Sequence, residues 1–395
     1  MMKIFGKEKI VVLVCSLFVF FNSIYITAQT VNNYSIKTWW GPSAPPFSPV
    51  INADKSVTFR IKAPRASEVS ISIGEWDVKP LFLTKDTTGV WSVTVYNMKP
   101  GITAYIFNVD GVQVPDWYNP LVKTGTQLYS SIVEVPSDSL NFDAIQNVEH
   151  GTLTIHKYIS SSLNVMRNLY VYLPPQYYTH PQQSFPVLYL RHGGGDNESS
   201  WTQISGSANI ILDNLIARHK AVPMIIVMPN GLTDGSWAGG SNKEGMKLLE
   251  DELLKDVIPL VEKTYRVAKG ASNRAIAGLS MGGGQSFVMG LHNTDKFSWI
   301  GEFSAGLLSD KDLNLDDLLP GVFSSPNEFN KKVKLLWIGC GDKDPRFIGH
   351  QLLVSTLNSR KIKNEFHVSS GGHEWGVWRE QLYGFMQKIF IYSNK

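Results

Sequence analysis

From residue 185 onward, the chain repeatedly places a short and continuously apolar run directly before a glycine. The runs are FPVLYLRHGGG (185–195), MIIVMPNG (224–231), RAIAGLS (274–280), KLLWIGCG (334–341) and NEFHVSSGG (364–372). Strands that are apolar on both faces must be covered on both faces, which is typical of a parallel sheet between helices. Stretches with helical spacing alternate with these runs, so the sequence predicts an α/β domain with a mainly parallel sheet and helices on both faces. In such a sheet the active site lies at the carboxyl ends of the strands.

The first third of the chain has a different pattern. SVTFRIKAP, EVSISIGEW, GVWSVTVYN and TAYIFNVDG alternate apolar and polar residues and are separated by short turns. Such alternation predicts a small antiparallel β-sandwich. We therefore expect a sandwich domain over residues 29–140, a polar linker over 141–150 and the α/β domain over 151–395. The length of 395 residues suits two domains.

The N-terminus has the features of an export signal. Lys3, Lys7 and Lys9 precede an apolar run over 10–21, and small and polar residues end at Ala28. This pattern predicts a signal peptide over residues 1–28 and a secreted or periplasmic protein, with an uncleaved anchor as the alternative. Removing three lysines and one glutamate with it lowers the formal net charge from +3 to +1. No charge then attracts nucleic acid or an anionic membrane.

Cysteine and metal-binding patterns exclude several kinds of site. Only Cys340 remains after residue 28, so the mature chain cannot form an internal disulfide, and the simplest interpretation of Cys340 is a small buried residue. No P-loop, dinucleotide-binding fingerprint or zinc-spaced histidine cluster is present. We expect neither a cofactor nor a metal.

A glycine-flanked serine is the strongest chemical signal. Gly278-Leu279-Ser280-Met281-Gly282 lies between the apolar run 274–279 and a helical stretch. This is the context of a nucleophile elbow, in which a strained turn exposes the serine hydroxyl above the sheet. Gly278 and Gly282 would keep the crowded turn free of side chains. A flexible glycine-rich loop explains the strand and helix on either side less well.

A serine hydroxyl needs a base, and the base needs an acid to orient it. The expected chain order is serine, acid, histidine. His367 falls within the alternating strand pattern, where a packed or solvent-facing ring is the simple interpretation, whereas His373 follows two glycines at the end of that strand. We therefore choose His373. Asp342 and Asp344 both follow the strand 334–341, and position alone does not separate them.

The same edge of the sheet offers donors for an oxyanion and aromatic rings for a substrate. The backbone N–H of Met281 and that of Gly194, in the loop HGGGDNE, are the expected oxyanion donors. Trp201, Trp237, Trp375 and Trp378 lie in or near these loops. The first three are candidates to stack on a sugar or an aromatic acid, while packing explains Trp378 equally well. In the sandwich, carbohydrate binding would require exposed aromatic residues. The candidates are Trp76, Trp91, Trp117 and Tyr118, of which we expect most, and Trp91 in particular, to fill the core.

Six motifs in order resemble those of carbohydrate esterase family 1, the esterase D-like branch of the α/β hydrolases: VYLPPQY, FPVLYLRHGGG, IIVMPNG, AGLSMGGGQS, WIGCGDKD and GGHEW. The resemblance covers residues 150–393, and the preceding sandwich resembles early-set immunoglobulin-like modules related to family 48 carbohydrate-binding modules. It implies Ser280 as nucleophile, His373 as base, Gly194 in the oxyanion loop and, from the turn Gly341-Asp342-Lys343-Asp344, Asp344 as the acid.

The family contains feruloyl and acetylxylan esterases. The resemblance therefore implies an esterase acting on an acylated plant polysaccharide or oligosaccharide. The alternatives are a siderophore esterase of the enterobactin type, an acyltransferase similar to the mycolyltransferases, and a non-catalytic carbohydrate-binding protein. A strongly basic site for a catecholate is not evident, the acyltransferases usually lack the extra sandwich, and the complete set Ser280, Asp344 and His373 argues against a non-catalytic protein.

Overall fold

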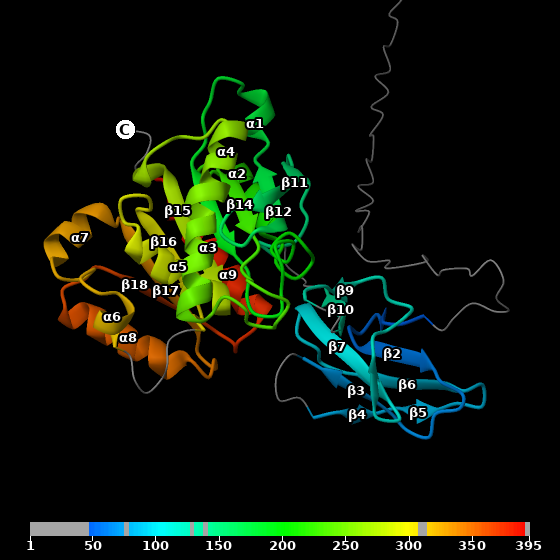
Figure 1. Cartoon of the computed structure of the whole chain (residues 1–395). Coiled ribbons are helices and arrows are strands. Elements are labelled where there is room, and N and C mark those ends of the chain that lie inside the picture. Colours follow the sequence, from blue (N-terminus) through cyan, green and yellow to red (C-terminus); the bar gives the residue numbers. More distant parts are fainter. Residues whose placement is uncertain (1–46, 75–78, 127–129, 137–140, 307–313, 392–395) are drawn as a thin grey trace, which may run out of the picture.

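The structure is a computed structural model, and it describes residues 47–74, 79–126, 130–136, 141–306 and 314–391. These residues form a β-sandwich followed by an α/β domain (Figure 1). The predicted signal peptide over 1–28 lies outside the described residues, and so does Trp76. Within the described ranges, no helix has both the length and the apolar character needed to span a membrane.

The sandwich consists of two antiparallel sheets, with strand orders β1-β2-β6-β5 and β4-β3-β7-β10-β9, and β8 pairs with β7. Its strands are β1 (Val50–Ile51), β2 (Val57–Lys62), β3 (Val69–Ile73), β4 (Leu81–Phe82), β5 (Thr84–Lys85), β6 (Val90–Val95), β7 (Gly101–Val109), β8 (Val112–Val114), β9 (Val122–Lys123) and β10 (Ser130–Val135).

Alternate residues of these strands form the sandwich core. Val57, Phe59 and Ile61 of β2 are buried, as the period of two predicts. Trp91 is also buried, and its indole N–H donates to the carbonyl of Ala63, which confirms its core position. Trp117, by contrast, is exposed.

The α/β domain is built on one sheet of eight strands, in the order β11-β12-β14-β13-β15-β16-β17-β18. The strands are β11 (Thr152–Ser160), β12 (Val165–Leu173), β13 (Val187–Arg191), β14 (Ile225–Pro229), β15 (Arg274–Leu279), β16 (Trp299–Phe303), β17 (Leu335–Gly341) and β18 (Glu365–Ser369). The six strands from β13 to β18 are parallel to one another, while β12 is antiparallel to both β11 and β14. The prediction of a mainly parallel sheet is confirmed.

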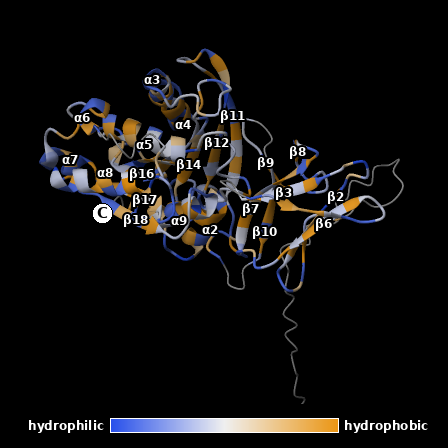
Figure 2. Cartoon of the chain, turned by 90° about the horizontal axis from the view of Figure 1, so that it is seen from below, coloured by the Kyte–Doolittle hydropathy of each residue, from blue (hydrophilic) through white to orange (hydrophobic). Residues whose placement is uncertain are grey.

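Helices cover both faces of this sheet (Figure 1). Helices α2 and α9 share one apolar core with the sheet, and α3, α4, α5 and α8 share the other. Figure 2 shows the apolar residues of the strands between these two layers. The helices are α1 (Gln176–Thr179), α2 (Ala208–Ala217), α3 (Lys243–Glu252), α4 (Ile258–Thr264), α5 (Ser280–His292), α6 (Leu315–Leu318), α7 (Pro326–Lys332), α8 (Phe347–Ser359) and α9 (Trp375–Met386), with a π-helical turn (Leu253–Val257) joining α3 to α4 and a 3₁₀ turn (Ala271–Asn273) before β15.

The predicted linker, residues 141–150, packs on the α/β domain. The side-chain amide of Asn214 donates to the carbonyls of Phe142 and Ala144, and Arg379 forms an ion pair with Asp143 at 2.8 Å. The segment between the domains is therefore fastened to α2 and α9. In Figures 1 and 2, the end of the sandwich that carries β9 and β10 lies nearest the α/β domain.

Candidate active site

Ser280 lies in a tight turn between β15 and α5. Its φ is 49°, in the left-handed region that a residue with a side chain rarely adopts. The flanking glycines are required by close approach of the backbone. A Cβ atom at Gly278 would lie 2.4 Å from the carbonyl oxygen of Gly282, and one at Gly282 would lie 2.3 Å from that of His192. The strand–turn–helix context predicted for this motif is present.

Loops at the carboxyl ends of three parallel strands bring Ser280, His373 and Asp344 together. His373 follows β18 and Asp344 follows β17. The Nε2 atom of His373 lies 2.9 Å from the Ser280 hydroxyl, and its Nδ1 atom lies 2.8 Å from Oδ2 of Asp344. An ionised carboxylate only accepts hydrogen bonds, so Nδ1 carries the proton and Nε2 is free to accept one from the serine. The arrangement can deprotonate Ser280 as it attacks a carbonyl carbon.

The surroundings of Asp344 keep it ionised. Burial alone would raise its pKa, but the hydrogen bond and charge of His373, the backbone N–H of Arg346 and the hydroxyl of Ser304 lower the pKa below its ordinary value. Its second oxygen, Oδ1, accepts from Arg346 N at 2.9 Å. The carboxylate is therefore available to orient the imidazole of His373.

Asp342 and His367, the alternatives to Asp344 and His373, contact other partners. Asp342 accepts a hydrogen bond from the backbone N–H of Gly371 at 2.8 Å and so ties down the loop that carries His373. The ring of His367 stacks on Trp337, with 4.8 Å between the ring centroids. Geometry thus separates Asp344 from Asp342, which position in the sequence could not do.

The glycine loop after β13 runs past the nucleophile. A Cβ atom at Gly193 would lie 3.5 Å from Cβ of Ser280. The peptide between Gly193 and Gly194 is fixed by His192, whose Nδ1–H donates to the Gly193 carbonyl at 2.8 Å, while its Nε2 accepts from Gly231 N at 2.8 Å. Burial lowers the pKa of His192 to about 4, so the ring stays neutral and can make both bonds.

Met281 completes this edge of the site from the other side. It is the second residue of α5 and is almost fully buried. The first N–H groups of a helix have no intrahelical acceptor, and they carry the positive end of the helix dipole. The backbone N–H of Met281 can therefore serve a developing negative charge beside Ser280.

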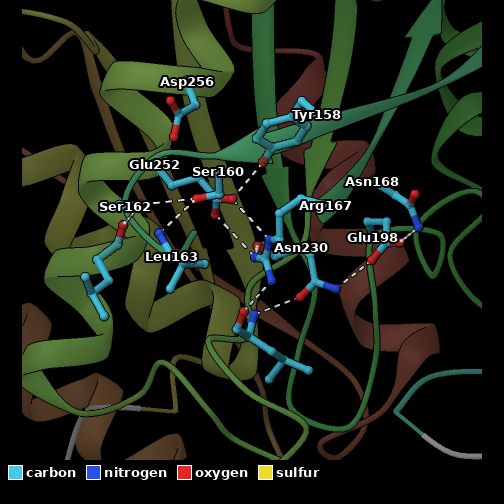
Figure 3. Close-up of polar contacts among 12 residues, drawn as sticks. Tyr158, Ser160, Ser162, Leu163, Arg167, Asn168, Glu198, Asn230, Glu252 and Asp256 are labelled. Atoms are coloured by element: carbon cyan, nitrogen blue, oxygen red, sulfur yellow. Dashed lines mark hydrogen bonds and ion pairs between the residues drawn. The ribbon is translucent and has the colours of Figure 1, made fainter. Parts of the chain in front are cut away.

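A buried polar network, drawn in Figure 3, holds the loops after β13 and β14 in place. Glu198 accepts hydrogen bonds from the side-chain amides of Asn168, at 2.9 Å, and Asn230, at 2.6 Å. Arg167 donates to the Asn230 carbonyl at 2.8 Å and is itself paired with the buried Glu252 at 3.1 Å. Sequence reasoning missed this network. Its members come from segments far apart in the chain, and although Asn230 and Glu198 lie within quoted motifs, nothing in the sequence indicates that they pair with Asn168 and Arg167.

Two of the three proposed aromatic contacts are wrong. The indole of Trp201 is fully buried and donates to the Arg191 carbonyl, and Trp375 is buried against Trp201 and Trp378. Neither ring can reach a substrate, because both fill the core between the sheet and α9. Trp378 packs edge-on against the ring of His373, with 4.9 Å between centroids.

Trp237 has the exposure that a substrate contact requires. Its side chain is 49% exposed and lies on the glycine loop, where a Cβ atom at Gly194 would come within 2.9 Å of the indole ring. The indole therefore borders the site directly beside one expected oxyanion donor.

Charged residues of both signs lie in the loops around Ser280, and the basic ones, Lys343 and Arg346, are in the loop after β17 that carries Asp344. Loops 193–198, 231–241 and 371–375 contain four carboxylates (Asp196, Glu198, Asp234 and Glu374) and no lysine or arginine. In the part of the chain that the structure describes, no group of three or more histidine, cysteine, aspartate or glutamate side chains could hold a metal ion. Cys340 is buried, and burial raises the pKa of its thiol.

Comparison with known proteins relates the chain to esterases. A family model described as "Putative esterase" matches residues 160–389. The chain is 34% identical over 351 residues to an endo-1,4-beta-xylanase/feruloyl esterase of Xylanibacter ruminicola, a match that covers 87% of this chain and 46% of the relative. The chain thus spans about half the length of that relative.

Of two similar solved structures, one covers most of the α/β domain and the other covers both domains. A ferulic acid esterase is similar with a TM-score of 0.52 and 26% identity, over 61% of this chain and 98% of the other. The enterobactin esterase of Shigella flexneri is similar with a TM-score of 0.64 and 16% identity, over 89% of this chain and 98% of the other. At that identity the second likeness shows the fold alone, an α/β hydrolase preceded by a β-sandwich.

Proposed function

The chain belongs to the esterase family whose model matches residues 160–389, and on that premise we propose that it is a serine esterase that removes feruloyl groups from xylan-type plant polysaccharides. The single observation that carries the proposal is the chain of hydrogen bonds from Ser280 through His373 to Asp344, at 2.9 and 2.8 Å. It supplies a nucleophile, a base and an orienting acid in one line.

In the acylation step, Ser280 Oγ attacks the ester carbonyl carbon while His373 Nε2 takes the hydroxyl proton. The resulting imidazolium is stabilised by the Asp344 carboxylate. The carbonyl oxygen becomes an oxyanion, which the backbone N–H groups of Met281 and Gly194 stabilise. When the tetrahedral intermediate collapses, the bond to the sugar oxygen breaks and His373 returns the proton to that oxygen. The products are a sugar with a free hydroxyl and an acyl-enzyme on Ser280.

In the deacylation step, water takes the place of the sugar. His373 removes a proton from the water as it attacks the acyl carbon, and the same two N–H groups stabilise the second oxyanion. Collapse releases the carboxylic acid, and His373 returns the proton to Ser280 Oγ. Each turnover consumes one water molecule, and no cofactor takes part.

Two observations support a feruloyl group over an acetyl group. The relative from Xylanibacter ruminicola and a similar solved structure are both described as feruloyl or ferulic acid esterases. In addition, the half-exposed indole of Trp237 borders the site beside Gly194, where an aromatic acyl group could stack on it. An acetyl group would make no use of such a surface.

A siderophore esterase of the enterobactin type is the second candidate. The likeness to the enterobactin esterase favours it, since that likeness covers 89% of the chain and so includes the sandwich. Against it stand the loops 193–198, 231–241 and 371–375, which carry carboxylates but no lysine or arginine, and the basic residues of the site loops are limited to Lys343 and Arg346 in the loop after β17. An anionic catecholate would be repelled there, whereas an acylated neutral sugar would not.

The deciding experiment compares three substrates: methyl ferulate, acetylated xylan and a catecholate trilactone. Purified protein lacking residues 1–28 is tested on each, with Ser280→Ala as the blank for nucleophile-dependent hydrolysis. The proposal expects the highest kcat/KM on methyl ferulate. Preference for the trilactone would establish the second candidate, and no hydrolysis of any ester would favour a non-catalytic carbohydrate-binding protein.

The site of action follows from the substrate. A polymeric xylan does not enter cells, so we propose that residues 1–28 direct the protein to the periplasm or the medium. An N-terminus beginning at Gln29 in protein recovered from those fractions would support this, and retention of residues 1–28 in the recovered protein would contradict it.

A further inference from the structure

The sandwich domain touches the glycine loop of the candidate active site directly. The backbone N–H of Thr126, which follows β9, donates to the carbonyl of Gly195 at 2.9 Å. On the other side, the N–H of Gly195 donates to the carbonyl of Trp237 at 2.7 Å. The two peptide units that flank Gly195 are therefore held by different domains, one by the sandwich and one by the α/β domain.

The contact is one of backbone on backbone. A Cβ atom at Gly125 would lie 1.9 Å from the carbonyl oxygen of Gly195 and 3.2 Å from Cα of Asp196. No side chain fits there unless the two domains separate. Two further hydrogen bonds flank the contact: Asn197 Nδ2 donates to the Gly125 carbonyl at 3.4 Å, and the Thr124 hydroxyl donates to Gln203 Oε1 at 2.7 Å.

We propose that the tripeptide Thr124-Gly125-Thr126 of the sandwich domain is a positioning element of the oxyanion hole. The tripeptide and the Trp237 carbonyl fix the peptides on either side of Gly195, and His192 fixes the peptide before Gly194. Between these anchors, the N–H of Gly194 has little freedom to move. This inference rests on the proposed esterase function, and it adds that the sandwich acts on the chemical step as well as on any binding of sugar.

The reason is the geometric demand of oxyanion stabilisation. Donors contribute fully only when they lie about 2.7–3.1 Å from the oxyanion. A displacement of about 1 Å can cost about a hundredfold in rate. Without the tripeptide, the loop would keep only the anchors from His192 and the Trp237 carbonyl, the peptide after Gly195 would lose its bond to Thr126, and the Gly194 N–H would sample positions outside this range. The loss would fall on kcat, because the oxyanion exists only after attack has begun.

The test is Gly125→Ala, measured with 4-nitrophenyl acetate, which carries no sugar for the sandwich to bind. We expect kcat to fall ten- to a hundredfold, with KM changed less than about twofold. Affinity for an aryl boronic acid, which forms a tetrahedral adduct on the serine, should fall by the same factor as kcat/KM, while affinity for ferulate should not change. The matched control is Gly376→Ala in α9, where an added Cβ meets no atom within 4 Å, and its kinetics should equal those of the wild type.

The outcomes separate this inference from the proposed function. If the wild type hydrolyses the ester and a folded Gly125→Ala variant has a kcat within twofold of the wild-type value, the inference is overturned and the proposed esterase function stands. Absence of hydrolysis of every ester by the wild type overturns the proposed function. If Gly125→Ala does not fold, Thr124→Val removes only the bond to Gln203 and should lower kcat two- to tenfold with KM unchanged. An unchanged kcat in that variant also overturns the inference.

Discussion

Asp344 and Asp342 lie two residues apart, and the structure assigns them contacts that substitution by asparagine would affect very differently. Asp344 uses both carboxylate oxygens: Oδ1 accepts from Arg346 N, and Oδ2 accepts from Nδ1 of His373. An amide has only one oxygen. In Asp344→Asn that oxygen can keep the bond to Arg346, and the NH₂ group then faces His373 Nδ1. This selects the tautomer with the proton on Nε2, which can no longer accept the proton of Ser280.

The expected loss in kcat for Asp344→Asn is about 10⁴-fold, as for the same change in a serine protease triad. That corresponds to about 5 kcal/mol in the activation free energy. In Asp342→Asn, the amide oxygen can still accept the bond from Gly371 N, so we expect a loss of less than about tenfold.

The assay is kcat/KM for methyl ferulate near neutral pH, together with the rate of phosphonate labelling of Ser280, which reports the nucleophile without deacylation. Thermal unfolding of both variants serves as the control for folding. A larger loss of activity in Asp342→Asn than in Asp344→Asn, or an Asp344→Asn rate above a tenth of the wild-type rate, would refute the assignment of Asp344 as the orienting acid.

Three further predictions concern the nucleophile and the sandwich. Ser280→Ala should abolish hydrolysis and phosphonate labelling while leaving the thermal unfolding temperature within a few degrees, since it removes one hydroxyl and no core volume; near-normal turnover in the folded variant would contradict the assignment. Burial raises the pKa of Asp116 to about 6, above its unfolded value, so the native state holds this proton more tightly and stability is lost as the pH rises through 6. Between pH 5 and 7.5 the free energy of unfolding should therefore fall by about 1 kcal/mol more in the wild type than in Asp116→Asn, measured by urea denaturation, and equal slopes would show that Asp116 does not titrate in this range. Finally, most aromatic rings in the alternating strands belong to the core, so the isolated sandwich, residues 29–140, should not be retained on insoluble xylan or starch, and tight retention would make it a targeting module.

Patterns local in the chain could be predicted, and contacts between distant segments could not. The turn at Ser280 could be predicted from Gly278 and Gly282, where an added Cβ atom would collide with backbone atoms. This signal lies within five consecutive residues. The parallel sheet follows from strands that are apolar on both faces. In contrast, β11 and the antiparallel pairing of β12 have no comparable signal, and the pair of Arg167 with Glu252 joins residues 85 positions apart.

The tryptophans show a second limit. Trp201 and Trp375 stand next to the predicted catalytic loops, but sequence neighbourhood does not tell whether a loop residue points to the site or to the core. Both pack under the site, and of the three candidates Trp237 alone lies beside it at the surface. Burying an indole removes a large apolar area from water, so a tryptophan next to an active-site loop is stabilised in the core as readily as in the cleft.

The glycine-to-glycine contact between Gly125 and Gly195 bears on how the two domains can be exchanged. Domains that are connected only by a flexible linker can be exchanged between proteins, because their surfaces do not have to be complementary. Here each surface carries a bare backbone segment that leaves room only for the other, and the joining segment is fastened to α2 and α9. A sandwich from a different protein that has a side chain at the position of Gly125 would collide with the backbone of the α/β domain at Gly195. The two domains are therefore expected to be inherited, and to be engineered, as a matched pair.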